Sequence, residues 1–164
     1  YLQLNDLFDM EVTTKIKLKP YLREFLIAKF GEEPIRFPEN SDLLALIHVL
    51  RIKPPKRDIV QDDVNTEIVI PYQRLGRDPR TYNYLGKRAQ MEFQKRVHTL
   101  FCITLNDYVA HKVHVEQFEW QAAIELFAEE YHIESITTDG LKQKNYRDQN
   151  GKRFKRENRF KHLN

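Results

Sequence analysis

Residues 85–112 read LGKRAQMEFQKRVHTLFCITLNDYVAHK and carry a hydrophobic pattern that persists for nearly the whole stretch. The apolar side chains recur at the three- and four-residue spacing of one helical face, at Ala89, Phe93, Val97, Leu100 or Phe101, Leu105 and Tyr108. A stripe of this kind is typical of an amphipathic helix whose apolar side faces a core. We therefore predict one long helix over residues 85–112, with Phe93, Val97 and Phe101 mostly buried.

Two shorter helices are predicted after the long one. The first covers about residues 116–131, and its apolar residues, including Phe118 and Trp120, span so wide an arc that we expect burial on more than one side. Thr137 or Thr138 can cap a third helix that reaches about residue 149. No apolar period continues after Gly151, so residues 151–164 are predicted to be a flexible basic tail.

The sequence before the long helix mixes strands with helices. Residues 12–19 alternate apolar or threonine positions with lysines, which indicates a half-buried strand, and residues 68–70 predict a second one. Between them, Pro20 suits the start of a helix that Gly31 ends, and Asn40 or Ser41 can cap a helix over residues 43–50. The predicted fold class is α+β, in which a strand and helix layer over residues 12–72 is followed by a helical part over residues 85–149. Residues 1–150 are expected to form a single domain around one shared core.

The charge is distributed unevenly along the 164 residues, whose net charge is +3. Residues 141–164 alone carry a net +7, so the remaining residues sum to −4. An acidic body with a basic end is typical of a chain that meets polyanions, although a basic tail can also serve only solubility. Cys102 is the single cysteine, and no apolar run is long enough to span a membrane. We therefore expect a cytoplasmic protein with no internal disulfide and no membrane partner.

Residues 128–147 contain the spacing of a small residue, a turn and two apolar anchors. Ala128 is the small residue, Ile133 follows the turn, and Leu141 is the inward contact of the next helix, while His132 stands where such a turn usually has glycine. The segment resembles the helix-turn-helix class of DNA-binding proteins, including winged helices. The resemblance implies that the helix from about residue 138 enters the major groove. Gln143, Asn145 and Arg147 would then face base edges, and Lys142 and Lys144 would meet phosphates. Two ordinary packed helices are the alternative.

Two other basic regions support a nucleic-acid partner. Residues 74–96 carry a net +5, and the loop that contains Arg74, Arg77 and Arg80 resembles the wing of a winged helix. Residues 142–161 interleave cations with aromatic side chains, a composition that suits phosphates and unpaired bases. The tail cations assigned to this role are Lys152, Arg153, Lys155 and Arg156.

A rival DNA-reading element is found at the other end of the chain. A lysine-alternating strand followed by two helices resembles the ribbon-helix-helix arrangement, in which strands from two subunits pair in the major groove. In that case Thr13, Lys15 and Lys17 would face the bases, and the protein would be a homodimer.

The sequence contains no recognisable catalytic motif. It has no glycine-rich phosphate loop and no nucleophile motif, and His111 with His114 has no third metal ligand at a partner spacing. We expect no cofactor, no metal and no enzyme activity. The favoured function is nucleic-acid binding, with double-stranded DNA preferred over RNA, in transcription or in the replication of a mobile element. A protein-interaction module with a solubilising tail is the alternative, and an enzyme whose site is assembled from distant residues is a third.

Overall fold

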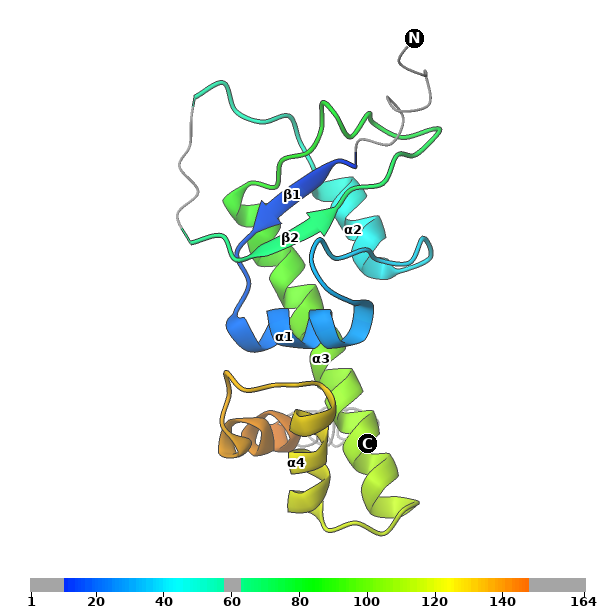
Figure 1. Ribbon diagram of the computed structural model, residues 1–164, viewed down its shortest axis with the longest axis vertical. Coiled ribbons are helices and arrows are strands. Elements are labelled where there is room, and N and C mark those ends of the chain that lie inside the picture. Colours follow the sequence, from blue (N-terminus) through cyan, green and yellow to red (C-terminus); the bar gives the residue numbers. More distant parts are fainter. Residues whose placement is uncertain (1–10, 58–62, 148–164) are drawn as a thin grey trace, which may run out of the picture. The chain divides into compact units, whose positions relative to one another are not determined.

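The computed structural model describes residues 11–57 and 63–147 (Figure 1). The elements follow the order β1 (Thr13–Ile16), α1 (Pro20–Phe30), α2 (Asp42–Leu50), β2 (Thr66–Val69), α3 (Lys87–His114) and α4 (Trp120–Glu130). A further helical stretch covers residues 138–147. The predicted α+β class, with its strands in the N-terminal part and helices after them, is confirmed. None of the described helices is both long enough and apolar enough to cross a membrane.

The chain divides into two compact units, and each is described by itself. Unit 1 comprises the residues up to Lys19 together with Lys29–Val97, and unit 2 comprises Pro20–Ala28 together with the residues from His98 onward. α1 and α3 each contribute residues to both units. The single domain over residues 1–150 stays a prediction.

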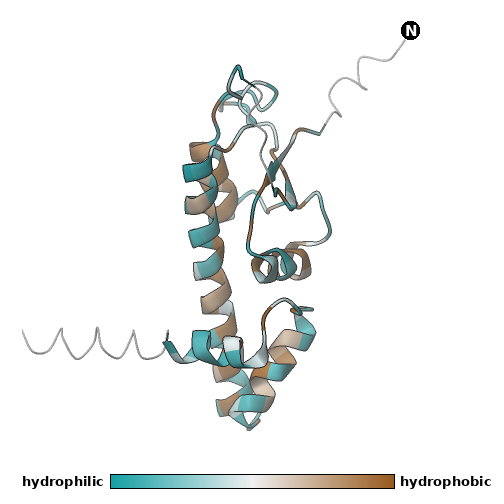
Figure 2. Cartoon of the chain, turned by 90° about the vertical axis from the view of Figure 1, so that its left-hand side faces the viewer, coloured by the Kyte–Doolittle hydropathy of each residue, from teal (hydrophilic) through white to brown (hydrophobic). Residues whose placement is uncertain are grey.

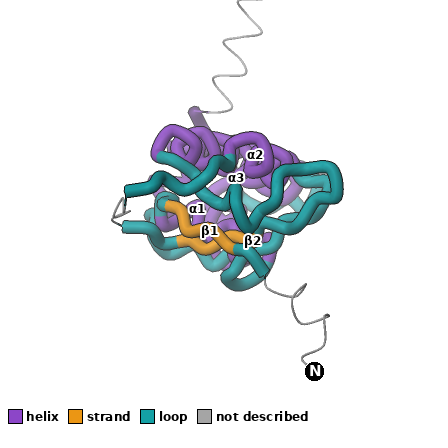
Figure 3. The backbone as a smooth tube through the Cα atoms, turned by 90° about the horizontal axis from the view of Figure 1, so that it is seen from above, coloured by secondary structure: helices purple, strands orange, loops and turns teal. Residues whose placement is uncertain are grey.

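Unit 1 is built on a two-stranded antiparallel sheet. β1 pairs with β2 in a register that sets Thr13 opposite Val69 and Ile16 opposite Thr66 (Figure 3). Ile16 is buried and Lys15 is exposed, as the alternation predicts. After β1, the backbone N–H of Lys17 donates to Oε1 of Gln90 at 2.9 Å, which attaches the strand to the first turns of α3.

The remainder of the unit 1 core comes from α2 and the aromatic residues near it. Ser41 caps α2 as predicted, because its Oγ accepts a hydrogen bond from the backbone N–H of Leu44 at 3.2 Å. Ile47 is fully buried on the inner face of α2. The ring of Phe37 lies with its centroid 5.1 Å from that of Phe30 and 6.0 Å from that of Phe93. Aromatic pairs at these distances add to the stability gained by burial.

Unit 2 has an aromatic core centred on Phe101. Its ring centroid lies 5.2 Å from Tyr21, 5.3 Å from Phe25 and 5.8 Å from Phe127, in edge-to-face geometry. Burial raises the pKa of the Tyr21 hydroxyl to about 12, and the nearby Cys102 acts in the same direction. The core of unit 2 is therefore formed by rings from α1, α3 and α4.

The long helix is confirmed, and its bounds differ from the prediction by two residues at each end. Phe93, Val97 and Phe101 are fully buried, and the open choice between Leu100 and Phe101 is decided for Phe101. Figure 2 shows hydrophobic residues recurring along α3 between hydrophilic ones.

The predicted two-sided burial of α4 is wrong. The helix begins at Trp120 and buries one face, formed by Ala123, Ile124 and Phe127. Phe118 precedes the helix and is 40% exposed, and Trp120 in the first turn is 41% exposed. Ala122 and Leu126 on the flank of this face are half-buried, so the apolar arc of the sequence is wider than the fully buried face.

Candidate nucleic-acid interface

The basic loop after β2 is organised by Arg51, a residue that the sequence analysis did not single out. Arg51 follows α2, and only 1% of it is exposed. Its Nη2 donates to the carbonyl oxygen of Arg77 at 2.7 Å, and its Nη1 donates to that of Tyr82 at 3.4 Å. A buried guanidinium needs acceptors, and the loop backbone supplies two of them, while Nε of Arg51 is buried without a hydrogen-bond partner among the described residues. Removal from water lowers the pKa of Arg51, and the positive charge of Arg77 lowers it further.

Further contacts join the loop to residues 51 and 52. Arg77 returns a hydrogen bond from its Nη1 to the carbonyl oxygen of Arg51 at 3.3 Å. Ile52 and Tyr84 exchange two backbone hydrogen bonds, at 2.9 and 3.1 Å. The backbone N–H of Gly76 donates to the carbonyl oxygen of Gln73 at 3.2 Å, which closes a turn within the loop. The backbone of residues 73–84 is therefore held at several points.

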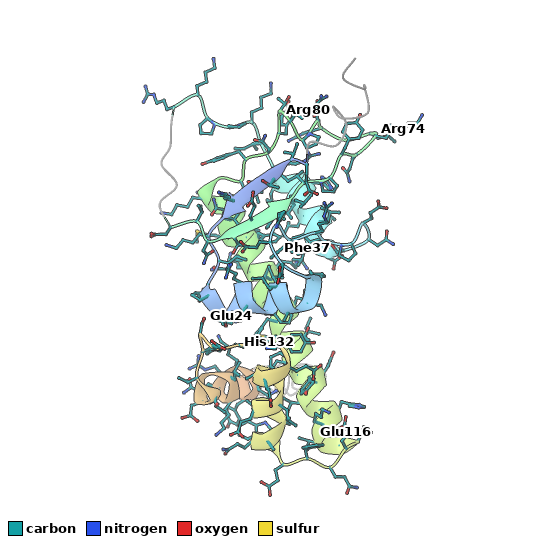
Figure 4. All side chains as sticks on the ribbon, viewed as in Figure 1. Glu24, Phe37, Arg74, Arg80, Glu116 and His132 are labelled. Carbon is teal, nitrogen blue, oxygen red and sulfur yellow. The ribbon has the colours of Figure 1, made fainter. Side chains whose placement is uncertain are left out.

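The outward side chains of residues 72–82, together with those of the neighbouring residues 53–57, form a set that we call the basic loop surface. It consists of Lys53, Lys56, Arg57, Tyr72, Arg74, Leu75, Arg77, Arg80 and Tyr82. All of them are exposed except Tyr82, which is partly buried. Figure 4 shows Arg74 and Arg80 projecting from the loop.

The cations of this surface differ in their electrostatic partners. Nη2 of Arg80 lies 3.0 Å from Oδ2 of Asp78, and hydrogen bonds from Arg80 hold the pKa of Asp78 below its usual value. Asp78 therefore stays ionised and offsets the charge of Arg80. Among the described residues, no carboxylate forms an ion pair with Lys53, Arg74 or Arg77. Lys53 and Arg77 instead lie over the ring of Tyr82, at 5.4 and 5.3 Å from its centroid.

Asn145 does not have the base-facing position that the helix-turn-helix resemblance implied. It is fully buried, its Nδ2 donates to Oδ1 of Asn106 at 2.6 Å, and its Oδ1 accepts a hydrogen bond from Nε1 of Trp120 at 2.9 Å. Leu141, one turn earlier on the same face, is also fully buried. We therefore remove Asn145 from the candidate site.

The other predicted residues of this helix face outward to different degrees. Gln143 and Arg147 are exposed. Lys142 is partly buried, and its Nζ lies 3.2 Å from Oε1 of Gln121 and 3.4 Å from Oδ1 of Asp139. Nζ of Lys144 lies 4.9 Å from the ring centroid of Tyr21. Both lysines thus have contacts inside unit 2.

The connection between α4 and the next helix is longer than that of a helix-turn-helix. Residues 131–137 separate the two helices, whereas the motif uses about three or four residues. His132 has a φ of 49°, the left-handed conformation for which the motif favours glycine, and Ile133 is buried as the resemblance implied. Glu24 of α1, labelled with His132 in Figure 4, accepts hydrogen bonds from the backbone N–H groups of Glu134 and Ser135. The anchors are therefore present, but the turn is not that of the motif.

The ribbon-helix-helix alternative is not supported by the pairing of β1. The ribbon needs strands from two subunits, whereas β1 pairs with β2 of the same chain. Thr13 donates from its Oγ1 to Oε1 of Glu67 at 2.5 Å, and Nζ of Lys17 lies 3.3 Å from Oδ2 of Asp63. Two of the three residues proposed as base readers, Thr13 and Lys17, therefore have partners within unit 1, whereas Lys15 is exposed.

Two further sets of residues from the sequence analysis are the histidines considered as metal ligands and the cations of the tail. Within residues 11–57 and 63–147, no group of three or more His, Cys, Asp or Glu side chains is arranged to hold a metal ion. His111 instead has its Nε2 3.3 Å from Oε1 of Glu116. The tail residues Lys152, Arg153, Lys155 and Arg156 lie outside the described residues.

Comparison with known proteins adds no relative to this description. No protein-family model, curated protein or solved structure matches the chain.

Proposed function

We propose that the chain is a non-enzymatic nucleic-acid-binding protein whose phosphate contacts come chiefly from the basic loop surface. The observation that supports this most is the held backbone around Arg51, from which Lys53, Arg74 and Arg77 project without an ion pair among the described residues. Cations that replace condensed counterions on phosphates provide most of the free energy of non-specific binding. Because the loop is ordered before it meets a ligand, little additional conformational entropy is lost on binding.

Helix 138–147 has a smaller part in this proposal than the helix-turn-helix resemblance implies. The burial of Asn145 removes one predicted base contact, and of the three predicted base readers only Gln143 and Arg147 are exposed. Contacts to phosphates position a protein on nucleic acid but carry no sequence information. We therefore propose strong dependence on salt and weak dependence on sequence.

Fluorescence anisotropy with labelled duplex and single-stranded oligonucleotides tests this function. If about six phosphates are neutralised, the slope of log K against log salt is expected to be roughly −5. Replacing Arg74 or Lys53 by Ala should flatten the slope by about 1 each. Lys29→Ala, which removes an exposed cation of α1, is the matched control and should leave the slope unchanged. Absence of binding to any oligonucleotide at low salt would contradict the proposal.

The basic tail is proposed to add further phosphate contacts through Lys152, Arg153, Lys155 and Arg156. A chain shortened by residues 151–164 should bind the same oligonucleotides more weakly and with a flatter salt slope. An unchanged slope would assign the tail to solubility alone.

A second candidate function, homodimerisation or another protein contact, is favoured by a separate observation in unit 2. Val115, Phe118 and Trp120 are all exposed large apolar residues, and they lie within six residues of one another at the connection from α3 to α4. Clustered exposed apolar residues often mark interaction sites. Sedimentation velocity of the wild type and of Phe118→Ser tests this candidate, because a dimer formed through this cluster should dissociate in the variant.

A further inference from the structure

The basic loop surface combines cations with exposed aromatic and aliphatic side chains. Tyr72 is 70% exposed and Leu75 is 100% exposed, and Arg74 lies between them in the sequence. Phosphate binding alone needs only the cations. Exposed apolar groups among cations gain favourable contacts only from a ligand that offers both charge and flat apolar faces.

The two tyrosines of this surface have different surroundings. The ring of Tyr82 already has Lys53 and Arg77 as cation partners, and its backbone carbonyl accepts from Arg51. Tyr82 is thus part of the framework of the loop. Among the described residues, no ring contact or cation contact involves Tyr72. Tyr72 is the ring that remains accessible to a ligand.

Two arginines belong to the same loop as Tyr72. Arg80 projects from this loop in Figure 4. Arg74 is two residues from Tyr72 along the chain and is exposed. A base stacked on Tyr72 would therefore have cations near its own phosphates.

We infer that the basic loop surface binds single-stranded nucleic acid, with Tyr72 as the platform for an unpaired base and Leu75 as an apolar contact beside it. This inference rests on the proposed function and specifies its ligand. Unpaired bases offer their faces to aromatic side chains, whereas bases in a duplex are stacked on each other. Arg74, Arg77 and Lys53 bind the phosphates of the same strand. The ligand that the sequence favours, double-stranded DNA, is therefore expected to bind more weakly at this surface.

The test compares three substitutions by fluorescence anisotropy on the full chain. The ligands are an oligothymidylate of roughly 12 nucleotides, within the site sizes known for small single-strand-binding domains, and a duplex of similar length. Tyr72→Ala should weaken binding to the single strand by about 5- to 100-fold, as expected for the loss of one stacked base. Tyr72→Phe keeps the ring and should stay close to wild type. Leu75→Ala should weaken single-strand binding to a smaller extent, and duplex binding should be unchanged in all three variants.

Because Tyr72 and Leu75 are exposed, these substitutions are expected to leave the fold intact, which circular dichroism and a thermal midpoint check directly. If both ligands bind and Tyr72→Ala leaves single-strand affinity unchanged, the inference is wrong while the proposed function stands. Equal loss of affinity in Tyr72→Ala and Tyr72→Phe also overturns the stacking role. If neither ligand binds at low salt, the proposed function itself fails. Vesicles containing phosphatidylserine are the last ligand in the test. If they bind in a Tyr72-dependent way and oligothymidylate does not bind, the surface is assigned to a membrane instead of nucleic acid.

Discussion

The basic loop surface of unit 1 and the helix over residues 138–147 of unit 2 are both rich in cations, and each contains or adjoins a buried polar side chain that joins it to other parts of its unit. Arg51 is buried beneath the loop and turns the neighbouring cations outward by holding the backbone carbonyls of Arg77 and Tyr82. Asn145 is buried on the inner face of its helix and joins that helix to Asn106 of α3 and Trp120 of α4. Each region is thus fixed by one buried polar side chain.

This comparison shows why cation content alone is a poor guide to a binding surface. In the loop, Lys53 and Arg77 lie over the ring of Tyr82, and neither they nor Arg74 has an ion pair among the described residues. In the helix, Lys144 likewise lies over the ring of Tyr21, but Lys142 lies beside Oε1 of Gln121 and the carboxylate of Asp139. Lys142 must leave a carboxylate before it meets a phosphate, whereas the three loop cations need not. The loop is therefore the better candidate for the first contact.

The largest expected effects concern the cores on which the two regions rest. Phe93 lies in the core of unit 1 and Phe101 in that of unit 2, and both are fully buried. Phe93→Ala and Phe101→Ala should each lower the free energy of unfolding by about 3–5 kcal/mol, measured by urea titration. Met91→Ala and Ile103→Ala change exposed residues of the same helix and should each cost less than about 0.5 kcal/mol. Near-neutral results at Phe93 and Phe101 would contradict the core assignments.

A smaller effect is expected from Arg51→Leu, which tests the loop half of the comparison. The substitution deprives two loop carbonyls of a charged donor, so we expect a loss of about 2–3 kcal/mol in the free energy of unfolding. Oligonucleotide affinity should fall as well, because the loop loses its fixed shape. Arg74→Leu removes the same charge from an exposed position and should lower affinity without lowering stability. Unchanged stability in Arg51→Leu would show that the loop does not depend on this guanidinium.

Parts of this arrangement could be predicted from the sequence because they follow from local periodicity. The stripe of α3 persists over so many turns that it predicts the helix and its buried residues together. The alternation of β1 predicts which residues face the core, since a strand has a period of two. The second predicted strand begins at residue 68, whereas β2 begins at Thr66. The start is difficult to predict because residues 66–70 are nearly all buried and show no clean alternation.

The helical spacing of the sequence also indicates that Arg51 and Asn145 lie on buried faces. Arg51 lies four residues after Ile47 and eight after Leu43, so it continues the buried face of α2. Asn145 lies four residues after Leu141, which the helix-turn-helix resemblance assigns to the inner face of the same helix. The usual exposure of Arg and Asn concealed both positions.

Other features depend on contacts distant in sequence and could not be predicted. The path of residues 73–84 is set by Arg51 and by pairing with Ile52, more than twenty residues away. The sequence shows Tyr72 and Tyr82 in similar basic surroundings, and only the folded loop distinguishes the accessible ring from the one that already has partners.

The helix half of the comparison is tested by Asn145→Ala, with an effect expected to be smaller again. The change removes the acceptor of Trp120 Nε1 and the donor to Asn106, so we expect a loss of about 1–2 kcal/mol in urea titration. Preference among DNA sequences should not change, because Asn145 does not reach the surface. Gln143→Ala, on the exposed face of the same helix, should leave stability unchanged. A relaxed base preference in Asn145→Ala with normal stability would restore the reading-helix interpretation.

The smallest effect is a pH dependence that originates beside Arg51. Both ring nitrogens of His48 are buried without a hydrogen-bond partner among the described residues. Burial lowers the pKa of His48 below its ordinary value of 6.5, and the charge of Arg51 lowers it further. The unfolded chain therefore binds this proton more readily than the folded one. The stabilising contribution of the neutral imidazole is present above pH 6.5 and is lost as the pH falls below it.

Urea titrations of the wild type and of His48→Gln at pH values from about 8 down to about 5 isolate this contribution. The wild type should lose stability more steeply than the variant below the ordinary histidine pKa, whereas the two curves should run parallel above it. If Arg51→Leu reduces the steepness seen in the wild type, the guanidinium that holds the basic loop also contributes to the pH response of α2. Parallel curves for the wild type and His48→Gln over the whole range would contradict the buried, neutral state of His48.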